Sequence, residues 1–232
     1  MSALVWDQTG ERFYETGTDK AVLYPYKSNA YQEGVAWNGI TAVTESPSGA
    51  EATALYADNI KYLNLMSAEE FGMTIEAYTY PDEWGECDGS ASPSTGVKVG
   101  QQKRIPFGFC FRTRHGNDTD GTDKGYKLHL VYNCLASPSE RSYATINDSP
   151  EAITFSWEVT TTPTAFTSNA FKDLYKPTAC IVIDSTTADA TKLAALEAQL
   201  YGQDADAEHS IEAITPNLPS PDAVLAMFAT NG

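Results

Sequence analysis

The three histidines are the natural place to search for chemistry, because imidazole acts as a metal ligand and as a general base near neutral pH. They are His115, His129 and His209, and no two of them stand at the spacing of an HxH or HExxH motif. His129 falls on the polar side of a strand-like pattern, where a structural histidine is expected rather than a catalytic base. The sequence also contains no GxSxG elbow, phosphate-binding glycine loop or dinucleotide fingerprint.

The segment 117–123, NDTDGTD, is the nearest approach to a metal motif. If Gly121 held the sixth position of an EF-hand loop, Gly116 would hold the first and Lys127 the last. Lys127 would then place a cation where a bidentate glutamate is required. An acidic turn between two strands is therefore predicted instead. We expect no metal, no cofactor and no enzymatic activity.

The cysteines and the overall charge narrow the classes of protein further. Cys87, Cys110, Cys134 and Cys180 are widely spaced and form no CxxC pair, so buried reduced thiols are expected. The net charge of −16 disfavours a protein that grips nucleic acid or anionic membrane surfaces. Residues 1–7 lack a basic stretch followed by an apolar run, so no secretory signal is expected, and no apolar run approaches the roughly 20 residues that span a bilayer. We therefore expect synthesis in a cytoplasm and no membrane contact.

Alternation of apolar and polar residues predicts half-buried strands along most of the chain. The strands are clearest at 71–80, 105–113, 125–135 and 152–162, and weaker at 21–26, 35–44, 60–65 and 179–184. A helix is expected over 188–201, where leucines recur at helical spacing, with polar capping residues at 184–187 and Gly202 as a stop. A turn of helix at 81–86 and a short apolar run from 223 to 229 follow the same reasoning.

Two segments, 45–59 and 87–102, are weakly patterned and are expected to be loops. The chain is therefore predicted to be mainly β, a sandwich or open barrel. Residues 1–202 form this domain with one flanking helix, and 203–232 form a C-terminal arm that packs on the same or an adjacent subunit.

Several consecutive blocks resemble the major tail tube proteins of long-tailed, siphovirus-type bacteriophages. The blocks are GVAWNGITAVTE from Gly34, LYADNIKYL from Leu55, EEF…IEAYTYPDE from Glu69, GNDT…GYKLHLVY from Gly116, and NDSP…ITFSWE from Asn147. Together they extend over about 34–202. The resemblance implies a fold of the phage tail tube type, similar to the tube proteins of type VI secretion systems. Some relatives add an immunoglobulin-like domain, which is not expected here.

The resemblance also implies a structural role in the virion tail. Subunits would form hexameric rings that stack into a tube, and DNA would pass through the lumen during ejection without specific binding. Partners would be further copies of the chain together with the tape measure, tail terminator and baseplate proteins. The protein would be made in the cytoplasm of the host bacterium.

Two sets of residues are candidates for this role. The polar faces of 71–80 and 152–162 must meet water, which is either the exterior or the lumen, and the resemblance favours the lumen. The lumen-facing candidates are Glu76, Thr154, Ser156 and Glu158. The segment 45–59 is expected to reach the neighbouring ring, and its candidates are Pro47, Gly49, Glu51, Leu55 and Tyr56.

Two other classes of function remain open at this point. A carbohydrate-binding or decoration β-sandwich module of a phage particle is supported by the aromatic content of 11%. In that alternative Trp84, which lies near a predicted turn, is a candidate for an exposed binding platform, whereas Trp157 is expected in the core. An enzyme is the third class, and the missing catalytic constellations disfavour it.

Overall fold

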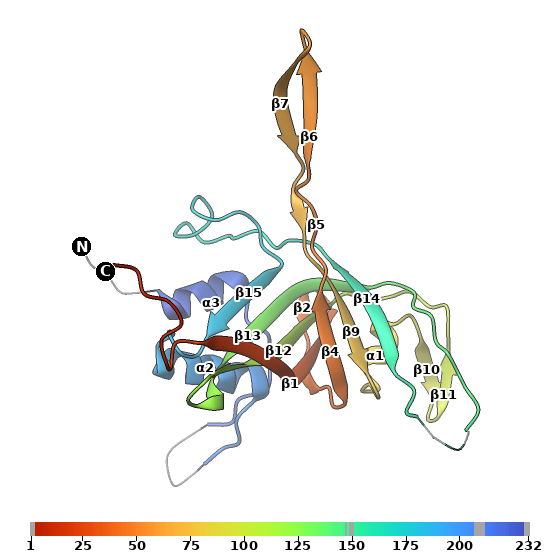
Figure 1. Ribbon diagram of the computed structural model, residues 1–232. Coiled ribbons are helices and arrows are strands. Elements are labelled where there is room, and N and C mark those ends of the chain that lie inside the picture. The colour runs from red at the N-terminus through yellow and green to blue at the C-terminus, as the bar shows by residue number, and fades with distance from the viewer. Residues whose placement is uncertain (1–2, 147, 149–150, 207–211, 230–232) are drawn as a thin grey trace.

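The computed structural model describes residues 3–146, 148, 151–206 and 212–229 (Figure 1). Strands account for 45% of the described residues and helices for 11%. The prediction of a mainly β protein with few helices is therefore confirmed. Among the described residues, none of the helices has the length and apolar character needed to cross a membrane.

One large antiparallel sheet forms the body. Its strands follow the order β2 (Ala30–Tyr31), β1 (Phe13–Lys27), β12 (Phe107–Asn117), β13 (Gly121–Ala136), β14 (Phe155–Thr161), β9 (Gly72–Ala77) and β4 (Ile40–Glu45). In addition, β15 (Cys180–Asp184) pairs with β13, and β3 (Val35–Ala36) pairs with β1. The eight stretches with alternating residues all contribute strands, although β1 and β13 begin earlier than the pattern indicates.

One face of the curled sheet encloses an aromatic core. Trp37, Trp84 and Trp157 contact one another there, with ring centroids 4.6 to 5.5 Å apart. Trp84 belongs to the short helix α1 (Trp84–Cys87) and is fully buried. The alternative in which Trp84 is an exposed platform is wrong, because α1 turns its aromatic side into the sheet. The Trp37 indole also donates a hydrogen bond of 2.8 Å to the carbonyl of Thr79, so its polar atom is satisfied.

Two helices, α2 (Ala190–Tyr201) and α3 (Pro221–Phe228), form a second core on the other face of the sheet. The leucines at positions 193, 196 and 200 are buried, as their spacing predicts. The helix begins later than expected, because the carboxylate of Asp189 caps it by accepting from the backbone N–H groups of Thr191 and Lys192. It ends at Gly202, whose φ of 81° suits glycine.

The C-terminal arm lies against this second core. Leu218 and Val224 are almost completely buried in it, and the hydroxyl of Ser220 caps α3. Ile211, which the sequence places among the apolar residues of the arm, lies outside the described residues. The described part of the arm therefore packs on its own chain, which is one of the two arrangements that the sequence left open.

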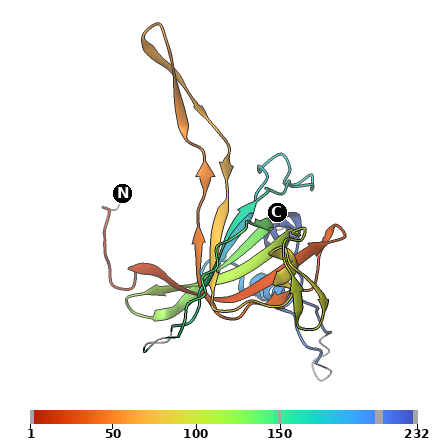
Figure 2. The ribbon, with the colours of Figure 1, turned by 90° about the vertical axis from the view of Figure 1, so that its right-hand side faces the viewer.

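Both segments predicted to be loops contain strands instead. Residues 87–102 hold the hairpin of β10 (Ala91–Ser94) and β11 (Val97–Val99). Residues 45–59 hold β5 (Ser48–Gly49) and β6 (Ala52–Ala57), which pair with β8 (Glu69–Glu70) and β7 (Ile60–Met66). The loop prediction is wrong here because these strands face water on both sides, so their sequences carry no alternating core pattern. Figures 1 and 2 show that β6 and β7 rise well clear of the body.

We expect the C-terminal arm to contribute to stability through Leu218, whose side chain is 2% exposed. Leu218→Ala should lower the free energy of unfolding by about 2–5 kcal/mol, because it leaves a cavity in a packed core. Leu174→Ala removes the same atoms at a position that is 72% exposed and should change little. Urea unfolding of the two variants checks this, and equal stabilities would show that the C-terminal arm does not stabilise the body.

Candidate functional site

The residues with catalytic potential do not form a reactive centre in the described parts of the chain. His129 is buried, stacks on Phe111 with ring centroids 4.4 Å apart, and its Nε2 lies 3.0 Å from the hydroxyl of Thr113. His115 lies on β12, and His209 lies outside the described residues. No group of three or more His, Cys, Asp or Glu side chains suited to a metal occurs in the residues that the structure describes.

The cysteines are free thiols held in the cores. Cys87, Cys110 and Cys134 are buried, and Cys180 is half-buried. Burial raises the pKa of Cys87, Cys110 and Cys180 to about 12, and it raises the pKa of Cys134 well above its ordinary value. A thiol that stays protonated is a poor nucleophile and metal ligand, so these side chains act as small hydrophobic groups.

The acidic segment 117–123 forms the turn between β12 and β13. The side-chain oxygen of Asn117 accepts from the backbone N–H groups of Thr119 and Asp120, while its amide donates to the carbonyl of Gly10. Asp118 accepts from the backbone N–H of Gly10. These polar groups therefore tie the N-terminal segment to the hairpin.

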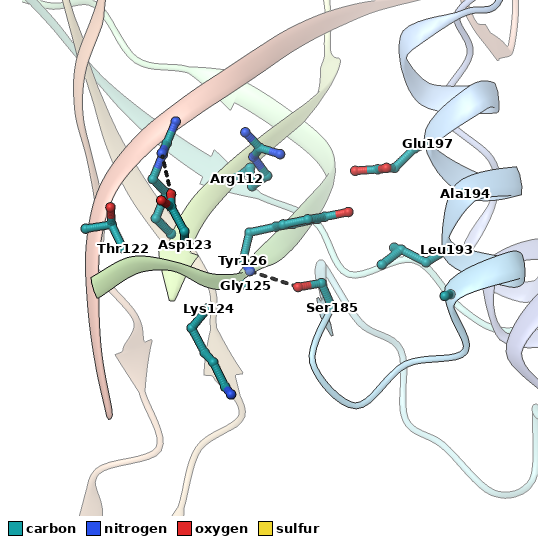
Figure 3. Close-up of a pocket in the computed structure, with 12 residues that line it drawn as sticks. Arg112, Thr122, Asp123, Lys124, Gly125, Tyr126, Ser185, Leu193, Ala194 and Glu197 are labelled. Carbon is teal, nitrogen blue, oxygen red and sulfur yellow. Dashed lines mark hydrogen bonds and ion pairs between the residues drawn. The ribbon is translucent and has the colours of Figure 1, made fainter. Parts of the chain in front are cut away.

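A polar cleft lies between this hairpin and α2 (Figure 3). Arg112 binds Asp19 through two hydrogen bonds of 2.6 and 2.9 Å, and these bonds hold the pKa of Asp19 below its ordinary value. The guanidinium also lies over the ring of Tyr126, at 4.6 Å from its centroid. Burial, with a contribution from Glu197, raises the pKa of Tyr126 to about 12. The pair of Arg112 and Asp19 connects β12 to β1. Arg112 is therefore not a free cation that the cleft could offer to a ligand.

The arm formed by β6 and β7 is the most unusual feature of the molecule. Its base, which we call the neck, consists of β5 and β8 together with the residues that join them to β6 and β7. Gly49 has a φ of 78° there, and a Cβ atom would collide with the carbonyl oxygen of Ala68. A two-stranded hairpin is marginally stable on its own in water. The arm therefore projects without the support that a third strand or a helix would give.

Large apolar side chains cover much of the arm. Leu55 pairs with Leu63 across the two strands, and Leu65 lies opposite Thr53 on the same side, so three leucines share one face. The exposed large hydrophobic residues of the arm, from 38% to 72% exposed, are Leu55, Tyr56, Ile60, Tyr62, Leu63, Leu65 and Met66. Exposed apolar side chains gathered on one element in this way are typical of a protein interface.

The candidates for the inter-ring contact all lie on the ascending side of this arm. Leu55 and Tyr56 are in β6, Gly49 is in β5, and Pro47 and Glu51 flank β5. The structure therefore places them in or beside two successive strands, β5 and β6. The descending strand β7, with its exposed tyrosine and leucines, was predicted as a strand but not as part of the contact. The signal that could have found it is its pairing with the apolar residues of β6.

The lumen-facing candidates lie on the uncovered face of β9 and β14. Glu76 pairs directly with Ser156, and Glu158 pairs with Thr74 on the same face. Glu158 is exposed and Glu76 is half-buried, while Met73, Ile75 and Trp157 point to the aromatic core. Thr154 is exposed and precedes the first residue of β14. The structure thus places three of the four candidates side by side.

Comparisons with known proteins do not assign the chain to a family. No family model matches it, and no curated protein matches it significantly.

We expect His129 to make stability depend on pH. Burial lowers its pKa below the ordinary value of 6.5; nearby Glu15 opposes this shift and Lys127 adds to it. The unfolded chain consequently takes up a proton at a higher pH than the folded chain. The contribution of the neutral ring is present above pH 6.5 and is lost as the pH falls below it towards the pKa of the folded state.

His129→Gln keeps polar atoms but does not titrate, so its free energy of unfolding should fall less between pH 7.5 and 5. Denaturant titrations of both proteins across this range measure the difference. Between pH 7.5 and 9 the two proteins should show the same slope, because His129 is then neutral in both states. Identical slopes below pH 6.5 would contradict this assignment.

Proposed function

We propose that the protein is a structural subunit that polymerises into a tube of stacked hexameric rings, of the kind that forms the tail tube of long-tailed bacteriophages. In this role it is a virion protein whose tube conducts DNA during ejection. Its partners are other copies of itself and the tape measure, tail terminator and baseplate proteins. The body is then a β domain of the tail tube type.

The observation that carries the proposal is the arm. An apolar ribbon that extends from the body exposes surface that water disfavours, at roughly 25 cal/mol per Å². A second copy of the chain would bury this surface. We infer that the arm contacts the body of the next copy and not its arm; such a contact is heterologous, and repeated heterologous contacts generate rings or open filaments.

The polar face of β9 and β14 supports the proposed conduit. A lumen that carries DNA has to avoid phosphate contacts, because weak contacts repeated in every subunit would add up to a large retention energy. Glu76 and Glu158 would supply negative charge at regular positions around such a bore.

The alternative of a carbohydrate-binding module receives less support. Trp37, Trp84 and Trp157 cannot supply an exposed aromatic platform, because they are at most 3% exposed. Trp6 is exposed, but it lies in the N-terminal segment outside the sheet.

Removal of the arm should abolish assembly and leave a folded body. Deleting Ala52–Met66 joins β5 to β8 through Ala50, Glu51, Ser67 and Ala68, a connection of a length common in hairpins. The wild-type protein should form hollow rods or rings in negative-stain electron micrographs. The deletion variant should remain monomeric by light scattering and should keep the circular dichroism of a β protein.

A matched pair of variants distinguishes the contribution of the leucine face to assembly from that of the arm as a whole. Leu55→Ser with Leu63→Ser should prevent assembly, because it removes an apolar cross-strand pair. Ala54→Ser with Asn64→Ser changes the facing pair on the other side of the ribbon and should have a much smaller effect. Normal rods from both the deletion and the leucine variant would refute the proposed role of the arm.

Reversal of charge at Glu158 should make the bore retain DNA. Glu158→Lys should change the free energy of unfolding by no more than about 0.5 kcal/mol, since the position is solvated. Tubes assembled in the presence of duplex DNA should then protect it from nuclease at low salt and release it as salt rises. Tubes of the wild type and of Glu11→Lys should protect little. Normal tubes of Glu158→Lys without protected DNA would place this residue outside the lumen.

A further inference from the structure

We propose that the acidic neck of the arm docks into a basic cleft at the opposite end of the body of a second copy of this chain. The inference rests on the proposed function and adds the surface that receives the arm. It follows from three observations. The cleft contains an excess of cations, the neck carries unpaired acids, and the strands of the body place the neck and the cleft at opposite ends.

The basic cleft, of about 640 Å³, is lined by Lys98, Arg104 and Arg141 around the ring of Tyr80. The ammonium of Lys98 lies 5.3 Å from the centroid of this ring, and the guanidinium of Arg141 lies 5.5 Å from it. A chain with 15 Lys and Arg residues against 31 Asp and Glu residues thus places three cations in one cleft. Such a concentration is suited to a negatively charged partner.

The acids within the cleft do not balance these cations. Asp88 is shared by both arginines, with a distance of 3.3 Å between its Oδ1 and the guanidinium of Arg104 and a second contact from its Oδ2 to Arg141. One carboxylate between two guanidinium groups leaves an excess positive charge. Lys98 pairs with Asp82 at 3.1 Å, but the side chain of Asp82 is 94% exposed, and such rim pairs exchange readily with other partners.

The neck carries the complementary charge. Glu51, Glu69 and Glu70 are exposed, and none of them forms an ion pair with any of the described cations. Glu51 also lines a shallow hollow beside Thr53 and Met66, into which a long cationic side chain could enter. Acidic residues outnumber basic ones along the whole arm and neck, where Lys61 is the single cation against Glu51, Asp58, Glu69 and Glu70.

The neck and the cleft lie at opposite ends of the same strands. β4 runs towards the arm and ends at Glu45, and β9 returns from it and ends at Ala77. Ala77 pairs with Phe155, the far end of β14, and the guanidinium of Arg141 lies 5.6 Å from the ring of Phe155. The six residues of β9 separate the two ends by roughly 20 Å.

This arrangement suits head-to-tail stacking. When copies stack in one orientation along the direction of the arm, the end of one body that bears the neck faces the end of the next that bears the cleft. The arm then extends along the second body, while the acids at its base meet Lys98, Arg104 and Arg141. Opposite charges at this position fix the register and orientation of the contact.

A charge-swap experiment tests the contact. Lys98→Glu reverses the cleft at a side chain that is 41% exposed, and the pair Glu69→Lys and Glu70→Lys reverses the neck. Each should raise the protein concentration needed for tube formation by about tenfold or more, because like charges then face each other. All three changes together restore opposite charges and should lower that concentration about threefold or more below that of the neck variant.

Lys124→Glu is the matched control, since it makes the same change in net charge at the β12–β13 hairpin. It should assemble as the wild type does, and circular dichroism verifies that every variant is folded. If the wild type forms no tubes, the proposed function fails and this contact fails with it. If the wild type forms tubes and Lys98→Glu matches Lys124→Glu, or if the combined variant shows no recovery, the contact alone is refuted.

Discussion

The packing of three tryptophans inside the curled sheet is the interaction on which the rest of the structure depends. Trp37 precedes β4, Trp84 belongs to α1 and Trp157 lies in β14, so their contacts join distant parts of the chain. Aromatic pairs of this geometry stabilise by about 0.5–1.5 kcal/mol beyond the burial of their area. They fix β4, β9 and β14 as a rigid platform. A rigid platform gives the arm a defined direction and holds the polar face and the basic cleft at fixed positions relative to it.

The arm formed by β6 and β7, unlike the body, has no packed core of its own. The body stabilises itself, whereas the ribbon of β6 and β7 gains little from its own pairing and exposes Leu55, Leu63 and Leu65. In the proposed assembly, its ordering would be coupled to contact with another copy. The stability of the arm would then depend on protein concentration, while that of the body would not. Such a division keeps a folded subunit available for assembly without requiring the interface to be complete beforehand.

The sequence predicted much of the body and less of the site, for physical reasons. Alternation identified β9 and β14 because each has one face in the core, and leucine spacing identified α2. It did not show that β13 is buried on both sides along Leu128–Tyr132, where neighbouring elements cover both faces. Nor did it show that 45–59 is a strand, because β6 faces water on both sides and its pattern carries no core signal. The basic cleft was not predicted, since Arg141 is distant in sequence from Lys98 and Arg104 and only the fold brings it to them.

Because the chain is strongly acidic, the positions of its few cations affect how subunits can associate. Subunits with a net charge of −16 repel one another, and this repulsion grows as salt falls. Apolar contacts of the arm favour association but do not discriminate well between orientations. A local excess of positive charge at the end of the body opposite the neck would lower the repulsion in one orientation only. An acidic surface with a basic cleft at this position would therefore oppose irregular aggregation and favour an ordered stack, and the bore could stay negative without preventing assembly.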